Sequence, residues 1–328
     1  MRLLLIDGHY YAYRSFFAIR DLSNSRGEAT NAIYGFVKTM RRMVKDLSPD
    51  LGAVVWDMGV PARRTELQPE YKAQREAMPD DLSLQIPIIQ RIVPLTGFAS
   101  LGVPNTEADD LIASYATAAR ARGIEVIIAT NDKDLYQLVD DGCRVYSTNK
   151  TDLPAPDVTY ALLGEEKVKE KWGVSAKQIG EVLALIGDSV DNIPGVEGVG
   201  PKTAANLLNE FGNIDTLLSN LSAVKNEKLR ARLESAVERI HQNREMVRLD
   251  LDLALPAALD DLTITPRLAE LAAELEACEF KGLLAEVRAD IKRSDIPTNA
   301  PTTPPHSAPV APPQSAPVSA APVQGELF

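Results

Sequence analysis

The sequence predicts an α/β protein with a mostly parallel sheet, followed by a helical module and a tail that cannot form a core. Three short apolar runs alternate with helical patterns in the first half of the chain, as in parallel sheets flanked by helices. Helical patterns dominate after about residue 155, and proline and alanine dominate after about residue 291. The expected division is 1–155 for the sheet domain, including segment 58–80, 156–290 for the helical module and the C-terminal helices, 291–323 for a disordered tether and 324–328 for a terminal peptide.

The composition is that of a soluble globular protein, with 328 residues of which 45% are hydrophobic and 25% charged. A net charge of −11 disfavours a nucleic-acid binder, unless bound cations neutralise part of the acidic groups. Cys143 and Cys278 are far apart, which predicts neither a disulfide framework nor a thiolate zinc site. No apolar run approaches the roughly 18 residues of a membrane span, so we expect a cytoplasmic protein without a membrane partner.

The three predicted strands are residues 2–6 (RLLLI), 53–56 (AVVW) and 125–130 (EVIIAT). Asp7 and Asp57 follow the first two strands directly, and Asp132 follows the third by two positions. Ligands of parallel sheets bind beyond the carboxyl ends of the strands. We therefore expect these three carboxylates to lie at one edge of the sheet.

Helices are predicted for Asn31–Asp46 and Thr106–Arg122 from their apolar spacing. Residues 58–80 contain three prolines and several basic residues but no clear apolar period. A crossover of this length without core residues is usually functional.

In the second half, Ser175 is expected to cap a helix over Ala176–Ile186, and the loop Asn192–Gly200 leads into a helix over Pro201–Phe211. Further helices are predicted for 225–247 and 267–289. The alternating run Met246–Leu253 (MVRLDLDL) is compatible with an added strand.

Acidic residues recur in five segments, at loops and helix starts. Each of them alone is explained as a helix cap or a partner of a helix N-terminus. Together they predict a site for hard cations, because no histidine or cysteine cluster accompanies them and oxygen ligands favour Mg²⁺ or Mn²⁺. Two such ions about 3.5–4 Å apart suit attack of water on a phosphodiester. The candidate ligands are Asp7, Asp57, Glu107, Asp109, Asp110, Asp132, Asp134, Asp188 and Asp191.

The glycine-rich loop 195–203 (GVEGVGPKT) is not a Walker A motif, because Pro201 separates Gly200 from Lys202. The spacing of a dinucleotide fingerprint also fails. What remains is a hairpin between helices, in which the glycines allow the backbone to approach a phosphate and the helix start favours an anion. A tight turn without a ligand is the alternative.

Several segments closely resemble the 5′ nuclease domain of bacterial DNA polymerase I, in the flap endonuclease superfamily: LLLIDGHYYAYR, NAIYGFVKTM, TEADD, TNDKDLYQL and GDSVDNIPGVEGVGPKTA. The resemblance runs from residue 1 to about residue 290. It implies a PIN-like core followed by a helix–hairpin–helix module that grips duplex DNA. It also implies 5′→3′ exonuclease and flap cleavage with two or more Mg²⁺ or Mn²⁺ ions. All nine acidic residues match metal-site positions of that family.

The same resemblance implies roles for other residues. In EYKAQR, Lys72 and Arg75 match basic residues of an arch over the single-stranded 5′ end, which makes them candidate catalytic and DNA-binding groups. Arg64 aligns with the same region, and Tyr10 is expected to stack on bases near the cleavage point. Gly195, Gly198, Gly200 and Lys202 match the helix–hairpin–helix turn, which in relatives often holds a K⁺ ion facing a DNA phosphate.

No polymerase domain follows in this sequence, so a free-standing nuclease is expected. The ending QGELF is similar to the bacterial sliding-clamp-binding peptide, in which Gln324 would make polar contacts while Leu327 and Phe328 fill a hydrophobic pocket. The expected partners are branched or nicked duplex DNA with a 5′ flap, RNA–DNA primer junctions and the sliding clamp, with the protein itself a monomer.

Two other functions remain open from the sequence: a non-catalytic scaffold that binds branched DNA and is recruited to the clamp, and a PIN-type ribonuclease. The complete acidic set favours an enzyme over a scaffold, because a pure binder gains nothing from carboxylates near phosphates. The helix–hairpin–helix pattern favours duplex DNA over RNA.

Overall fold

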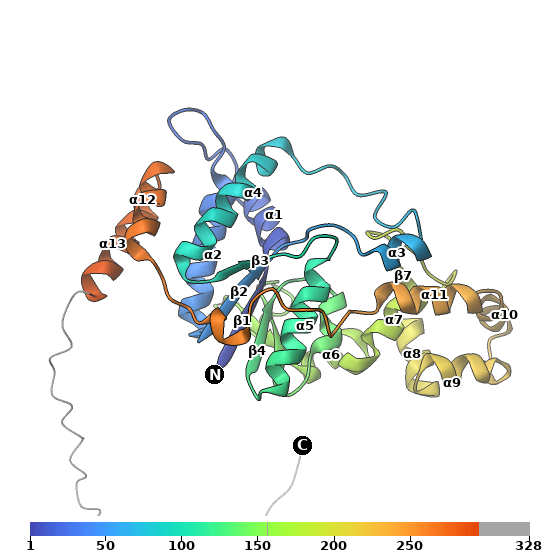
Figure 1. Ribbon diagram of the computed structural model, residues 1–328. Coiled ribbons are helices and arrows are strands. Elements are labelled where there is room, and N and C mark those ends of the chain that lie inside the picture. Colours follow the sequence, from blue (N-terminus) through green and yellow to red (C-terminus); the bar gives the residue numbers. More distant parts are fainter. Residues whose placement is uncertain (156, 295–328) are drawn as a thin grey trace, which may run out of the picture.

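A computed structural model describes residues 1–155 and 157–294, and the predicted tether and terminal peptide lie outside them. A six-stranded sheet in the order β3-β2-β1-β4-β5-β6 forms the centre, with helices on both faces (Figure 1). The predicted α/β class is thus confirmed. Within the described part of the chain, no helix is long and apolar enough to span a bilayer. The strands are β1 Arg2–Asp7, β2 Leu51–Val55, β3 Ala99–Leu101, β4 Glu125–Ala129, β5 Cys143–Ser147 and β6 Ala161–Leu163.

The strand order brings the carboxyl ends of β1, β2 and β4 together. Asp7 is the register partner of Val55 in β2, and Ile6 is the partner of Ala129 in β4. These pairings are parallel, as are β2 with β3 and β4 with β5, whereas β6 runs antiparallel to β5. The residues that follow β1, β2 and β4 therefore share one edge of the sheet, where ligands of such sheets bind.

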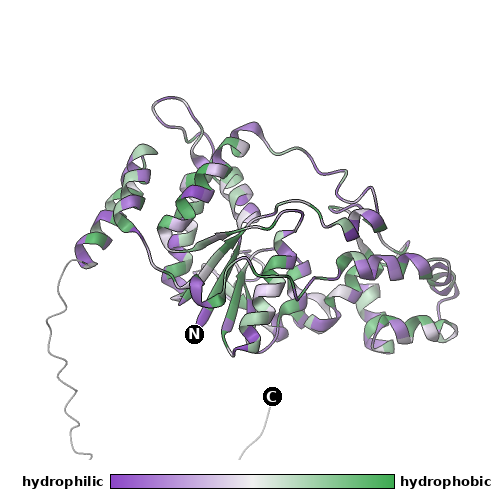
Figure 2. Ribbon diagram, viewed as in Figure 1, coloured by the Kyte–Doolittle hydropathy of each residue, from purple (hydrophilic) through white to green (hydrophobic). Residues whose placement is uncertain are grey.

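Both faces of the sheet are covered, so its strands are apolar without alternation. Leu3 and Leu5 of β1 pack in a cluster with α5 (Ala108–Ala121), and Leu4 and Ile6 pack in a second cluster on the opposite face. That opposite face is covered by helices α1 Gly8–Ala18, α2 Asn31–Leu47 and α4 Asp80–Ile92. The central strands are mostly in the hydrophobic colour in Figure 2.

Gly52 of β2 gives a direct test of this packing. A Cβ atom there would lie 2.4 Å from a ring carbon of Phe98, which is itself buried. We expect Gly52→Ala to lower the free energy of unfolding by about 1–3 kcal/mol through overpacking. Gly282→Ala is the matched control, because its Cβ would meet nothing within 4 Å. Urea titration measures both, and a Gly52→Ala variant as stable as Gly282→Ala would contradict the packing described.

The second half of the chain forms a helical module around a short hairpin. Ser175 and Gln178 form a capping box, but the predicted helix 176–186 begins as a 3-10 turn before it becomes α-helical at Ile179. The predicted helix Pro201–Phe211 is confirmed at both ends. The elements are α6 Glu165–Trp172, α7 Ile179–Ile186, β7 Gly187–Asp188, β8 Ile193–Pro194, α8 Pro201–Phe211, α9 Ile214–Ser219, α10 Glu227–Ser235 and α11 Val237–Val247.

The added strand over Met246–Leu253 is wrong. Met246 and Val247 end α11, and residues 248–253 have no strand partner. Side chains take the backbone groups that a strand would pair: the N–H of Asp250 donates to Asp110 at 3.0 Å, and that of Leu253 donates to the Ser114 hydroxyl at 3.1 Å. Alternation alone does not distinguish a strand from an extended connector held by side chains.

Helices α12 (Leu268–Ala277) and α13 (Lys281–Ser294) return to the sheet domain. The ring of Phe280, between them, lies 5.3 Å from that of Tyr34 in α2, and Arg41 of α2 pairs with Asp290 at 2.7 Å. In Figure 1 they lie at the end of the molecule opposite α8–α11. The sequence-based division grouped them with the helical module, and it also ended the sheet domain at residue 155, before β6.

Candidate functional site

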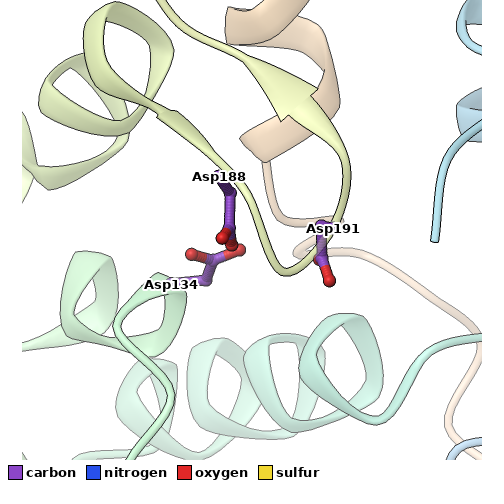
Figure 3. A group of neighbouring side chains, drawn as sticks. All are labelled: Asp134, Asp188 and Asp191. Atoms are coloured by element: carbon purple, nitrogen blue, oxygen red, sulfur yellow. The ribbon is translucent and has the colours of Figure 1, made fainter. Parts of the chain in front are cut away.

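Three carboxylates from two separate parts of the chain form one group. Asp134 begins the 3-10 helix η2 (Asp134–Leu138), Asp188 lies in β7, and Asp191 lies in the turn before β8. One oxygen from each lies within 4.8 Å of the others. In Figure 3 the carboxylates of Asp134 and Asp188 point toward one another, and Asp191 lies in the turn that follows Asp188.

This group fits a metal ion by its chemistry. Oxygen Oδ1 of Asp134 is buried and has no hydrogen-bond partner among the described residues. Burial, with the charge of Asp132 beside it, raises the pKa of Asp134 well above its usual range. A buried acceptor without a donor is costly. A divalent cation would satisfy that oxygen and neutralise the repulsion.

Asp7, at the predicted edge of the sheet, interacts electrostatically with a second set of acids that includes Asp132 and Asp57. Its Oδ1 accepts the N–H of Tyr10 at 3.0 Å, and its Oδ2 accepts the Thr130 hydroxyl at 3.1 Å. Burial raises the pKa of Asp7 to about 7, although the Tyr10 N–H opposes the shift. Asp7 therefore does cap α1, as the structural explanation required, but its carboxyl still suffers repulsion from Asp132 and Asp57.

Asp132 connects the two groups electrostatically. Burial raises the pKa of Asp109, in the first turn of α5, well above its usual range, and repulsion by Asp132 adds to the shift. Asp132 acts on Asp7 and Asp134 in the same way. Asp57, whose N–H donates to His9 Nδ1 at 3.2 Å, has its pKa raised by burial as well. So many close carboxylates indicate a place for cations.

The basic segment 58–80 lies against these acids. After α3 (Ala62–Leu67) it runs across to α4 (Figure 1). Lys72 Nζ donates to Glu107 at 2.6 Å, and Arg75 donates to Asp191 at 2.5 Å. The backbone N–H of Lys72, whose φ is +58°, donates to the carbonyl of Asp191 at 3.1 Å. Burial disfavours the charged form of Lys72, but Glu107 and Asp191 outweigh it and raise its pKa.

Sequence reasoning missed two further groups. The hydroxyl of Tyr71 donates to Asp191 at 3.1 Å, and Lys133 Nζ donates to Asp188 at 2.6 Å. Tyr71 is only 8% exposed, so segment 58–80 does contain a core residue, contrary to our expectation. The signals were present, because Tyr71 precedes Lys72 in EYKAQR and Lys133 lies between two of the predicted ligands.

Arg64 is not at the surface, where a DNA contact would need it. Its side chain is 3% exposed and pairs with Glu107 and Asp110. Asp110, 1% exposed, accepts from both terminal nitrogens of Arg64, at 2.7 and 2.9 Å. The expected DNA contact of Arg64 does not agree with this placement. Its positive charge instead neutralises the buried carboxylates of Glu107 and Asp110.

The glycine loop follows the hairpin that carries Asp188 and Asp191. A Cβ on Gly195 would lie 2.0 Å from the carbonyl of Ile186, and Gly198 has φ +73°, so the turn itself requires both glycines. Gly200, the residue before α8, has nothing within 4 Å of an added Cβ, and Lys202 is exposed. A tight turn therefore explains Gly195 and Gly198 but not Gly200.

Tyr10, the residue expected to stack on a base, is half-buried in α1. Its hydroxyl accepts a hydrogen bond from Arg14 at 2.9 Å.

Two family models cover most of the chain. Residues 2–173 match the 5′-3′ exonuclease N-terminal resolvase-like domain, and residues 174–270 match the 5′-3′ exonuclease C-terminal SAM fold. A 5′-3′ exonuclease of Aquifex aeolicus is 39% identical over 286 residues, which span 87% of this chain and 94% of the relative. The thermostable DNA polymerase I of Thermus thermophilus is 40% identical over 285 residues, but this chain spans only 33% of its length.

The fold is also that of a solved nuclease. A bacteriophage T5 flap endonuclease, in a pseudo-enzyme–product complex with DNA and metal ions, superposes with a TM-score of 0.61 at 23% identity. The superposition covers 89% of this chain and 98% of the phage protein. At 23% identity this likeness establishes only a shared fold. The two family models and the Aquifex relative establish similarity in sequence. The chain, whose sheet edge and hairpin bring acidic residues together, therefore belongs to the 5′-3′ exonuclease family.

Proposed function

We propose that the protein is a metal-dependent 5′-3′ exonuclease and flap endonuclease, which hydrolyses phosphodiesters at the 5′ ends of branched or nicked DNA. The observation that carries the proposal is the group of Asp134, Asp188 and Asp191, with its buried oxygen that has no donor among the described residues. Membership of the exonuclease family supports the reaction, and the family's DNA polymerase I members support a role in replication and repair.

The acidic groups divide the proposed work between them. Asp134, Asp188 and Asp191 would hold one ion, and Asp7, Asp109 and Asp132 a second, with Asp57 and Glu107 adjoining. Because all these donors are carboxylates, Mg²⁺ or Mn²⁺ fits better than zinc. Two such ions would lower the pKa of a bound water and neutralise the negative charge that develops on the phosphate.

Lys72 and Arg75 would hold the phosphate that is cut. Both already lie against the carboxylates, and Arg75 remains 45% exposed, so its guanidinium is accessible to a DNA phosphate. Segment 58–80 would cover the single-stranded 5′ end, as its contacts with Glu107 and Asp191 suggest. Tyr10 would stack on a nearby base.

The loop before α8 would hold the duplex. Free N–H groups at the helix start favour a phosphate, Gly200 leaves room for its approach, and Lys202 adds a positive charge. A K⁺ ion held by backbone carbonyls of the loop would add to this attraction.

We propose 5′ flaps and RNA–DNA primer junctions as substrates of a cytoplasmic monomer. Both described cysteines are free, in keeping with a reducing compartment.

A flap substrate tests the proposal. DNA with a labelled 5′ flap should be cut near the junction with Mg²⁺ and left intact with a chelator. The same strand offered as single-stranded RNA should be cut far more slowly. Binding without cleavage would favour the scaffold, and faster cleavage of the RNA would favour a ribonuclease.

The terminal peptide supports a second proposal, that the sliding clamp recruits the enzyme through Gln324, Leu327 and Phe328. Deleting residues 324–328 should weaken clamp binding at least tenfold, or about 1.4 kcal/mol, because the two apolar anchors are lost. Surface plasmon resonance on immobilised clamp measures this. Deletion of residues 310–314, which shortens the chain equally, is the control, and cleavage of free flaps should not change in either variant. Equal clamp binding by both deletions would refute the proposal.

A further inference from the structure

Arg64 makes a buried junction between three segments that are far apart in the sequence. Its Nε donates to the carbonyl of Met246 at 3.1 Å, and Nη2 donates to that of Arg248 at 3.0 Å. Nη1 donates to Glu107 and, at 2.7 Å, to Asp110. Every nitrogen of the guanidinium thus has a partner at the N-terminal end of α5, at the last turn of α11 or just after α11, while Arg64 itself lies in α3.

Asp110 also bonds to two of these segments. Its two oxygens accept from Nη1 and Nη2 of Arg64, and Oδ1 also accepts the backbone N–H of Asp250 at 3.0 Å. One turn later in α5, the Ser114 hydroxyl donates to the carbonyl of Asp250 at 3.0 Å and accepts from Leu253 N–H at 3.1 Å. Helix α5 therefore holds the connector 246–253 at two successive turns.

Asp110 differs from the neighbouring acids in its hydrogen-bond partners, and this difference indicates its role. Among the described residues, Oδ1 of Asp134 is buried and has no donor. Asp110 instead faces a planar guanidinium in the two-pronged geometry that is among the strongest ion pairs. To bind a cation it would have to leave Arg64 buried and unpaired, which is unfavourable.

We infer that Asp110 is a positioning residue and not a metal ligand. Together with Arg64 it fastens α3, the N-terminal end of α5 and the connector 246–253 into one unit. This unit fixes Glu107, which pairs with Arg64, and the start of the segment that carries Lys72 and Arg75. The inference rests on the proposed function, because it concerns the same acidic site, and it removes one of the nine ligands that the sequence suggested.

Counting bound Mn²⁺ ions tests the assignment. Asp110→Asn should bind as many Mn²⁺ ions as the wild type in electron paramagnetic resonance titrations, whereas Asp109→Asn should bind one fewer. Loss of an ion in Asp110→Asn would overturn the inference. A wild-type protein that binds no Mn²⁺ at all would refute the proposed function instead, so the two failures are distinguishable.

Kinetics on the flap substrate give a second readout. Asp110→Asn should lower kcat/KM by about 10- to 100-fold, as is usual for residues that orient a site, and the loss should appear mainly in KM because segment 58–80 shifts. Arg63→Gln is the matched control. Arg63 also reaches the connector, at the carbonyl of Arg248 (3.1 Å) and the carboxylate of Asp250 (3.3 Å), but within the described part of the chain it bonds to neither Glu107 nor Asp110. Equal losses in the two variants would contradict the role of the pair.

The wild-type chain allows a test that does not depend on a variant's folding. Hydrogen exchange at the amide of Asp250 reports its bond to Asp110. Saturating Mg²⁺ should leave this amide as protected as before, because Asp110 stays with Arg64. Faster exchange on addition of Mg²⁺ would show that Asp110 moves to the ion.

Discussion

Replacing Asp134 or Asp188 by asparagine is expected to lower the rate of flap cleavage by at least a thousandfold, about 4 kcal/mol, while DNA binding persists. Each change removes an anionic oxygen from the group in which oxygens lie within 4.8 Å of one another, but it keeps the size of the side chain. Single-turnover cleavage of a labelled flap measures the rate, and fluorescence anisotropy with Ca²⁺ measures binding. Wild-type cleavage by either variant would refute the site.

The stability of the Asp134→Asn variant separates a ligand from a structural role. Burial raises the pKa of Asp134, so its ionised form costs stability in the metal-free protein at neutral pH. The neutral amide should therefore melt at least as high as the wild type without metal. Asp152→Asn is the control, because Asp152 accepts from Ser147 at 2.6 Å and Lys171 at 3.1 Å. That variant should lose stability but retain cleavage.

Lys72→Ala is expected to lower kcat by about 100- to 1,000-fold, the usual cost of one group that stabilises the charge of a transition state. Nζ of Lys72 lies 2.6 Å from Glu107, beside the carboxylates where the scissile phosphate would lie. Arg75→Ala should act more on KM, because Arg75 is more exposed. Stopped-flow cleavage with saturating and limiting flap separates the two constants.

The control for both changes is Glu76→Ala, an exposed residue of the same segment. It should cleave flaps at the wild-type rate or slightly faster, since it removes a negative charge from the segment that we propose to cover the DNA. A Lys72→Ala variant indistinguishable from Glu76→Ala would contradict the proposed role of the segment.

The sheet could be predicted where strands are fully buried on both faces. Residues 2–6, 53–56 and 125–130 are continuous apolar runs, and the structure confirms them as β1, β2 and β4 within one or two residues. β3 and β6 have three residues each, too few for a pattern, and β5 is interrupted by Arg144. Strand order and the antiparallel direction of β6 depend on tertiary pairing that no local pattern carries.

The acidic site could be predicted only in part for the same reason. Asp7 and Asp57 were located by the strands that they follow, since parallel strands end at one edge. The approach of Asp188 and Asp191 to Asp134 depends on how the hairpin β7–β8 packs on the sheet domain. Arg64 was expected to contact DNA because the resemblance aligns it with the basic region. Its burial has no local signal, because its partners Glu107 and Asp110 lie 43 and 46 residues away in the sequence.

Anomalous diffraction from a crystal soaked in Mn²⁺ tests most directly whether these carboxylates form a metal site. We expect a peak bounded by Asp134, Asp188 and Asp191, with a second near Asp7, Asp109 and Asp132, and ligand oxygens at roughly 2.0–2.2 Å. Asp110 should remain on Arg64. A crystal saturated with Mn²⁺ that shows no peak at either group would contradict metal-dependent hydrolysis at this site.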